Sequence, residues 1–282
     1  MQDTLRQYLT ISRPRFWPYL LGPYVVGVAA GGGELLAPLA WLIVIGLFFA
    51  YPANFIIYGI NDVYDYETDK LNPKKQGYEA LVKPESRWLV MRHALAWIVV
   101  GYLLLEFVPG HNDPAAWGLL GFYFFGVLYS MPPVRAKTKP FLDSVFNILY
   151  VFPALVGYGL AADRFPKWQL LVAAGLWCMA MHAYSAIPDI AADKKAKLRT
   201  VATVLGARGT LFFCALCYTG AAILSYRWLG VFALGAGAVY LAMMAVTLLN
   251  PTRDRVFKLY KYFPYLNMLV GMALFFWVIW KY

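Results

Sequence analysis

The feature that most constrains this chain is a series of apolar stretches, each long enough to cross a lipid bilayer as a helix. Short connections separate them along almost the whole chain. A stretch of roughly 20 apolar residues predicts a membrane-spanning helix, because in lipid every backbone polar group needs a partner within its own segment. The nine predicted spans cover about residues 17–34, 39–60, 88–108, 115–131, 141–162, 167–187, 209–226, 228–249 and 262–281.

Composition supports the same class. The chain is 61% hydrophobic and only 14% charged, which lies far outside the range of soluble domains. Residues 1–16 carry three arginines but no cleavage signature, so we expect no removable signal peptide. We therefore predict an all-α, polytopic membrane protein in which residues 1–282 form one transmembrane domain.

The basic residues predict an orientation. Twenty of the 25 Lys and Arg residues fall in alternate connecting segments, which are 1–16, 61–87, 132–140, 188–208 and 250–261. The positive-inside rule places these segments and the N-terminus in the cytoplasm and the C-terminus on the opposite side. Attraction to anionic lipid headgroups explains much of the net charge of +10, so nucleic acid is not an expected partner.

Two acidic motifs lie at the cytoplasmic ends of predicted spans. They are Asn61-Asp62-x-x-Asp65-x-x-x-Asp69 and Asp189-x-x-x-Asp193. On a helix, a spacing of four places side chains on one face, where carboxylates repel one another. Mg²⁺ relieves this repulsion, since it binds through a few carboxylates plus substrate phosphates. A helix, an acidic end and a basic loop follow one another in both places, so the motifs predict a two-sided magnesium–diphosphate site.

Several basic and polar residues are candidates for holding the substrate. Lys and Arg can bind the phosphate oxygens that magnesium leaves free, and each could equally be a topology anchor. The basic candidates are Arg13, Arg15, Lys83, Arg135, Lys137 and Lys139. Polar side chains at membrane depth tend to face the bundle interior, although a structural hydrogen bond between helices explains them as well. In this group are Asn54, Tyr58, Asp143, Asn147, His182 and Tyr184.

Cysteine chemistry is not expected. Cys214-x-x-Cys217 matches a redox or zinc spacing, but it lies in an apolar stretch without a second ligand pair. We predict that both residues, like Cys178, pack as small hydrophobes.

The acidic motifs together with the nine spans resemble the UbiA superfamily of intramembrane prenyltransferases, over essentially the whole chain. More narrowly, five motifs are similar to the lycopene elongase branch, whose members add five-carbon prenyl units to the ends of a carotenoid. These are Ser12-Arg-Pro-Arg-Phe-Trp17, Gly59-Ile-Asn-Asp62, Asn72-Pro-Lys-Lys75, Lys139-Pro-Phe-Leu-Asp143 and Ala183-Tyr-Ser-Ala-Ile-Pro-Asp189. One departure is Lys197, which stands where some members carry a further acid.

The resemblance implies nine transmembrane helices around a central cavity with a cytoplasmic polar cap, in a bacterial or archaeal cell membrane. It implies transfer of a five-carbon group from dimethylallyl diphosphate to lycopene or a related carotenoid, assisted by Mg²⁺. The metal ligands would be Asn61, Asp65, Asp69, Asp189 and Asp193. Asp62 would be a ligand, a partner of a lysine, or a base. Lys197 would mean fewer metal ligands in the second motif, or one more phosphate contact. From their position at membrane depth, we also predict substrate contacts for Asn54, Tyr58 and Tyr184.

Two other functions remain open. One is the same chemistry on an aromatic acceptor, as in quinone, haem or chlorophyll biosynthesis. The other is transport of a phosphorylated lipid. Transporters place their sites near the bilayer midplane, whereas these acids lie at helix ends, which favours an enzyme.

Overall fold

The computed structural model describes residues 2–32, 37–70 and 80–281 and contains helices but no strand among them. Its residues group into two compact units. Unit 1 is Met1–Arg135 with Phe152–Phe165, and unit 2 is Ala136–Val151 with Pro166–Lys281. The prediction of one domain over the whole chain stays a prediction. The Asn72-Pro-Lys-Lys75 motif lies outside the described residues.

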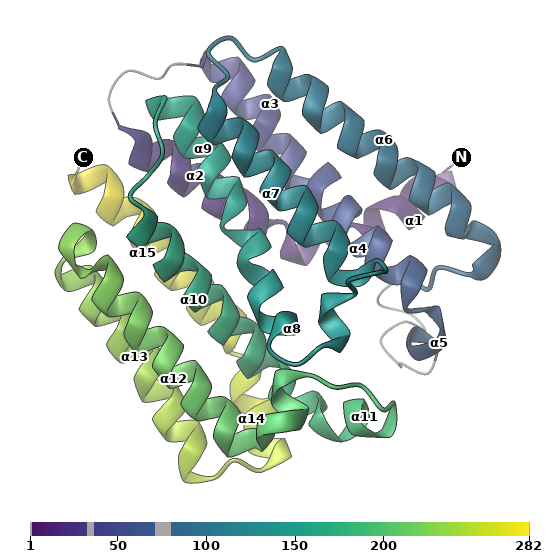
Figure 1. The fold of residues 1–282 in the computed structure, drawn as a ribbon, viewed down its shortest axis with the longest axis vertical. Coiled ribbons are helices and arrows are strands. Elements are labelled where there is room, and N and C mark those ends of the chain that lie inside the picture. The colour runs from purple at the N-terminus through teal and green to yellow at the C-terminus, as the bar shows by residue number, and fades with distance from the viewer. Residues whose placement is uncertain (1, 33–36, 71–79, 282) are drawn as a thin grey trace. The chain divides into compact units, whose positions relative to one another are not determined.

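Unit 1 is built from eight α-helices and two short 3₁₀ helices among its described residues (Figure 1). They are α1 (Gln2–Ile11), η1 (Pro14–Phe16), α2 (Pro18–Gly31), α3 (Leu39–Ala50), α4 (Pro52–Tyr64), α5 (Tyr66–Asp69), η3 (Pro84–Ser86), α6 (Arg87–Glu106), α7 (Asp113–Ser130) and α9 (Phe152–Ala162).

Glycines let α2 and α9 pack backbone to backbone in this unit. A Cβ on Gly27 would stand 2.0 Å from the carbonyl oxygen of Ala154, and one on Gly157 would stand 2.3 Å from that of Tyr24. No side chain fits at these distances. Small residues at helix contacts are typical of membrane bundles, where close van der Waals packing replaces the hydrophobic effect as the driving force.

Unit 2 contains three short 3₁₀ helices and seven α-helices among its described residues. They are η4 (Ala136–Thr138), α8 (Leu142–Val145), η5 (Phe146–Tyr150), α10 (Trp168–Ala186), η6 (Ile187–Asp189), α11 (Ile190–Lys195), α12 (Val201–Leu229), α13 (Val231–Leu249), α14 (Arg253–Tyr260) and α15 (Phe263–Lys281).

Aromatic contacts hold the long helices of unit 2 together. The rings of Tyr218 in α12 and Tyr240 in α13 stack with centroids 4.5 Å apart. The Tyr240 hydroxyl donates a hydrogen bond of 2.9 Å to Asn267 in α15. Cys178, Cys214 and Cys217 are free and buried, which confirms the prediction that they pack as hydrophobes.

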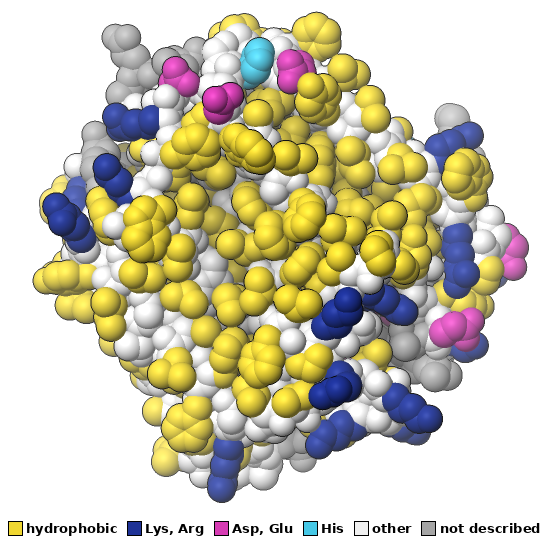
Figure 2. Space-filling view, in the orientation of Figure 1, with side chains coloured by type: hydrophobic (Ala, Val, Ile, Leu, Met, Phe, Trp, Pro, Cys, Tyr) yellow, Lys and Arg dark blue, Asp and Glu magenta, His cyan; other side chains and the backbone are white. Residues whose placement is uncertain are grey.

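The outer surfaces of the helices are apolar, as expected of a protein in lipid. Leu216, Leu249 and Trp280 are each more than 70% exposed, and apolar side chains cover much of the face seen in Figure 2. The all-α membrane class is confirmed, but the count of nine spans was not exact. Seven segments in the described part of the chain are long and apolar enough to cross a membrane, and α2 is apolar but shorter.

Candidate functional site

The first acidic motif starts on α4 but does not continue as one helix. α4 ends at Tyr64, and Asp65 has a non-helical backbone (φ −106°, ψ 6°) before the single turn of α5. Asp favours helix ends over helix interiors, because its short side chain competes for backbone hydrogen bonds. The prediction that Asn61, Asp65 and Asp69 share one face of a single helix is therefore wrong. The helix that carries Asn61 ends before Asp65.

Asp62 is the buried acid of this motif. Its side chain is 1% exposed, and its Oδ1 lies 2.7 Å from Nη2 of Arg13. The Arg13 guanidinium also lies over the ring of Tyr58, 4.5 Å from its centroid. A buried carboxylate is tolerated only when a well-placed partner replaces its water. Among the three roles expected for Asp62, the structure resolves a cationic partner, which is an arginine instead of a lysine.

Two further contacts orient the motif within unit 1. The Asn61 amide nitrogen donates to the hydroxyl of buried Ser130 at the end of α7, over 3.0 Å. The Arg135 guanidinium donates to the carbonyl oxygen of Tyr64 (3.3 Å) and lies 3.6 Å from Oδ1 of Asp65. The hydrogen bond to Ser130 fixes the orientation of the Asn61 amide, whose oxygen is the atom that can bind a cation.

The second motif follows α10 in unit 2. Asp189 ends η6 and is exposed, while Asp193 lies one turn later in α11 and is partly buried. The backbone N–H of Leu198 donates to the carbonyl of Asp193 (2.8 Å), which turns the chain back at the end of α11. Lys197 is exposed in this turn and has a left-handed backbone with φ 56°.

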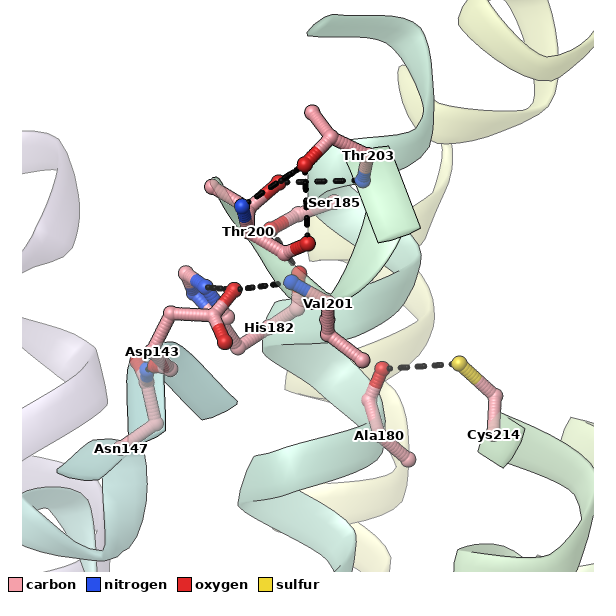
Figure 3. Close-up of polar contacts among 9 residues, drawn as sticks. All are labelled: Asp143, Asn147, Ala180, His182, Ser185, Thr200, Val201, Thr203 and Cys214. Atoms are coloured by element: carbon pink, nitrogen blue, oxygen red, sulfur yellow. Dashed lines mark hydrogen bonds and ion pairs between the residues drawn. The ribbon is translucent and has the colours of Figure 1, made fainter. Parts of the chain in front are cut away.

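The turn ends in a strongly capped helix. The hydroxyl of Thr200 accepts from the N–H of Thr203, and the hydroxyl of Thr203 accepts from the N–H of Thr200. This capping box at Thr200 precedes α12, which begins at Val201. Figure 3 shows the cap beside Asp143, His182 and Asn147. The predicted boundary of this helix, residue 209, was too late. A kink at Gly206 (φ 66°, ψ 174°) separates the first turn from the long apolar part.

Backbone strain coincides with the predicted phosphate contacts. Only five described non-glycine residues have positive φ, and Arg13, Arg135 and Lys197 are three of them, with φ of 50°, 43° and 56°. Such conformations cost about 1–3 kcal/mol each and persist where the surroundings hold them. Three predicted phosphate contacts therefore have a strained backbone, and a phosphate contact for each of them remains a prediction.

Two of the predicted polar residues have structural contacts. The Asn54 amide donates to the carbonyls of Phe49 (2.9 Å) and Ala50 (2.8 Å), so it caps the end of α3. Tyr184 is fully buried, with its hydroxyl 3.3 Å from that of Thr247 and its ring against Phe263. These contacts are of the structural kind that the sequence left open. A substrate role for either residue remains a prediction.

Two lysine candidates lie in short connections. Lys83 is exposed immediately before η3 in unit 1. Lys137 is partly buried within η4 of unit 2. A phosphate contact for either lysine remains a prediction.

The donor set fits magnesium by its chemistry. In the described part of the chain, no three Asp, Glu, His or Cys side chains form a group that could hold a metal on their own. Mg²⁺ does not require such a cage, since it usually takes one or two carboxylates together with waters and substrate phosphates. Asp65 and Asp69 in unit 1, and Asp189 and Asp193 in unit 2, supply oxygen donors of this kind.

Sequence reasoning missed the partners of the buried acids. It treated Arg13 as a phosphate contact and Asp143 as one of several polar residues at membrane depth. The available signal was the position of Asp143 inside a predicted span, where an acidic side chain is costly and marks a functional or paired residue.

Comparisons with known proteins agree with this fold. The profile of the UbiA prenyltransferase family matches residues 17–279. A protein named lycopene elongase/hydratase from Haloferax volcanii is 40% identical over 99% of this chain and 90% of its own length. The protein of the same name from Haloarcula japonica is 39% identical over 96% and 91%. A UbiA homolog from Archaeoglobus fulgidus, solved with DMAPP and Mg²⁺, has a TM-score of 0.71 at 21% identity and covers 95% of this chain and 99% of its own.

Proposed function

Because the chain belongs to the UbiA prenyltransferase family, we propose that it transfers a five-carbon prenyl group from dimethylallyl diphosphate to lycopene or a related carotenoid. The protein is an integral membrane prenyltransferase. The acceptor is suggested by the relatives named lycopene elongase/hydratase, which are 39–40% identical over nearly the whole chain. The observation that carries the chemistry is the pair of acidic motifs with strained basic residues beside them.

The acidic residues would receive the metal–diphosphate group. Asp65 and Asp69 of unit 1 and Asp189 and Asp193 of unit 2 are the proposed ligands, with the amide oxygen of Asn61 as a fifth. Bound Mg²⁺ would neutralise charge on the diphosphate as its bond to carbon breaks. In each unit the carboxylates stand at or next to a helix end.

The basic residues would hold the phosphate oxygens that the carboxylates do not serve. Arg135, Lys83, Lys137 and Lys197 are the proposed contacts. Arg13 has five N–H donors, and its pairing with Asp62 fixes the position of the guanidinium. Cations fixed in advance stabilise the negative charge that grows on the leaving group without reorganising during the reaction.

The hydrocarbon chemistry balances without a further co-reactant. The allylic C–O bond breaks, diphosphate leaves, and a carbon of the acceptor forms a C–C bond with the five-carbon cation. Loss of one proton from the acceptor completes the transfer, so the net addition is C₅H₈. Apolar surroundings exclude water from the cation until the new bond forms.

The test is product analysis with competing acceptors. Purified protein in lipid would be incubated with dimethylallyl diphosphate and Mg²⁺, together with either lycopene or an aromatic quinone precursor. We expect one or two C₅H₈ additions to lycopene by mass spectrometry, with or without one water for each addition. Products formed only from the aromatic acceptor would assign the protein to the aromatic branch of the chemistry, and no product from either would overturn the proposal.

We also propose that the N-terminus and both acidic motifs lie in the cytoplasm, from the distribution of Lys and Arg. The three native cysteines are buried, so an introduced cysteine can report the side of the membrane. In intact cells, a membrane-impermeant maleimide should label Arg164→Cys. It should label Arg199→Cys only after permeabilisation, and the reverse pattern would invert the topology.

A further inference from the structure

A buried carboxylate outside the acidic motifs has contacts that frame the second motif. Asp143 lies in α8 and is 0% exposed. Its Oδ2 accepts a hydrogen bond from the backbone N–H of Val201 (2.9 Å) and lies 3.6 Å from Nε2 of His182, as Figure 3 shows. Within the described residues its Oδ1 has no hydrogen-bond partner. A carboxylate kept at this depth is costly, so its contacts call for an explanation.

The two contacts lie on opposite sides of the motif in the chain. His182 belongs to α10, seven residues before Asp189. Val201 is the first residue of α12, eight residues after Asp193. One carboxylate oxygen therefore joins the element that enters the motif to the element that leaves it. Fixing both ends of a segment restricts the positions that its side chains can take.

The segment between these ends needs such restraint. It turns through the left-handed Lys197 and returns to Asp193 through the N–H of Leu198 before the capping box at Thr200. A strained residue keeps its conformation only when its neighbours hold it. The hydrogen bond from Val201 to Asp143 joins the end of this turn to α8.

We propose that Asp143 is a positioning residue that holds Asp189, Asp193 and Lys197 in the arrangement that receives the metal–diphosphate group. The inference rests on the proposed function of those residues. Asp143 does not itself touch the substrate, and it acts through the backbone of Val201 and the imidazole of His182. Residues that orient metal ligands typically change metal affinity by roughly 10–100-fold when they are removed.

Three variants in α8 test the proposal. Asp143→Ala removes both contacts, whereas Asp143→Asn keeps a side-chain oxygen that can accept from Val201. Ser144→Ala is the matched control, since Ser144 is the neighbouring residue, is also 0% exposed, and its hydroxyl has no hydrogen-bond partner among the described residues. The readouts are Mn²⁺ binding in the presence of inorganic pyrophosphate, followed by electron paramagnetic resonance, and amide hydrogen exchange over residues 190–201.

Asp143→Ala should weaken Mn²⁺ binding about tenfold and speed exchange in this segment, while the KM for the acceptor stays unchanged. Asp143→Asn should recover most of the affinity, and Ser144→Ala should bind as the unmodified protein does. If Asp143→Ala does not fold, Val201→Pro removes the donor from the other side. Proline is favoured at the first helical position, and Thr200 already has the extended backbone (φ −116°, ψ 167°) that a following proline requires. Val201→Pro should also weaken Mn²⁺ binding.

The variant Asp189→Asn distinguishes failure of the positioning role of Asp143 from failure of the proposed metal site. If Asp189→Asn weakens Mn²⁺ binding while Asp143→Ala and Val201→Pro do not, the positioning role is overturned and the metal site stands. If Asp189→Asn binds Mn²⁺ normally, the metal site in this motif fails and the positioning role fails with it.

Discussion

Each unit has a buried carboxylate, Asp62 within the first acidic motif and Asp143 outside the second, and the two have different partners. In unit 1, Asp62 pairs with the guanidinium of Arg13 at 2.7 Å. In unit 2, Asp143 accepts from the amide of Val201 and lies beside the imidazole of His182. The Asp62–Arg13 pair is stabilised by opposite charges, so its stability depends on charge balance. The hydrogen bond from the Val201 amide to Asp143 depends on the position of the acceptor oxygen. Unit 1 should therefore be sensitive to loss of a charge, and unit 2 to loss of an acceptor.

The largest expected effect involves both motifs at once. If the carboxylates of the two units act through Mg²⁺, a chelator should abolish transfer and added Mg²⁺ should restore it. The measurement is the rate of carotenoid product formation in EDTA and after readdition of metal. Full activity in EDTA would contradict a shared role of the two motifs in binding Mg²⁺.

Removing one acid from each motif should also have a large effect. Asp65→Ala and Asp189→Ala should each lower turnover on the order of a hundredfold or more, because each loses charge stabilisation at the breaking bond. Both variants should still insert in the membrane. Asp113→Ala, at an exposed carboxylate in the first turn of α7, is the control and should keep near-normal turnover. A folded Asp65 or Asp189 variant with normal turnover would remove its motif from the site.

The charge dependence of unit 1 is tested by Arg13→Ala. This change leaves Asp62 buried without its arginine, which should destabilise the protein by about 3–5 kcal/mol. Adding Asp62→Asn should recover part of the loss, because a neutral amide needs no counter-ion. Thermal unfolding in detergent measures both effects. Arg15→Ala is the control, since Arg15 is exposed and lies over the ring of Phe16. Equal losses from Arg13→Ala and Arg15→Ala would contradict the comparison.

The smallest effects are expected at the proposed phosphate contacts. Arg135→Ala and Lys83→Ala should raise the apparent KM for the diphosphate or slow its ionisation, roughly tenfold, since a hydrogen bond to a charged group contributes about 1.5–3 kcal/mol. Lys258→Ala changes an exposed lysine of α14, which has no acidic motif, and should leave both quantities nearly unchanged. The test is a titration of diphosphate at saturating acceptor. If all three variants lose activity equally and mildly, Arg135 and Lys83 serve only as topology anchors, as Lys258 does.

The helices were the most predictable part of the molecule. The described part of each of the nine apolar stretches is largely helical, although seven described segments meet the length and hydropathy expected of a span. Helix ends were less predictable, because they depend on local backbone geometry that hydropathy does not report. The break at Asp65 and the early start of α12 at Val201 are examples.

The contacts of the candidate residues could be predicted only in part. The spacing of acids indicated two motifs at helix ends, and the structure places them there. The sequence did not indicate that the amide of Asn54 caps α3 or that Tyr184 lies in the interior of unit 2. Polar residues in apolar helices satisfy whichever group packing brings near, and a residue type alone does not reveal that group.

The sequence by itself determined that this chain is a helical membrane protein with two acidic helix ends, because both properties are local. Backbone groups in lipid must bond within their own segment, and a run of apolar side chains records that requirement directly. Only the tertiary structure decided which group each buried carboxylate meets. Arg13 precedes Asp62 by 49 residues, and Val201 follows Asp143 by 58. Packing brings such distant groups within hydrogen-bonding distance, and the cost of an unpaired buried charge then keeps them together.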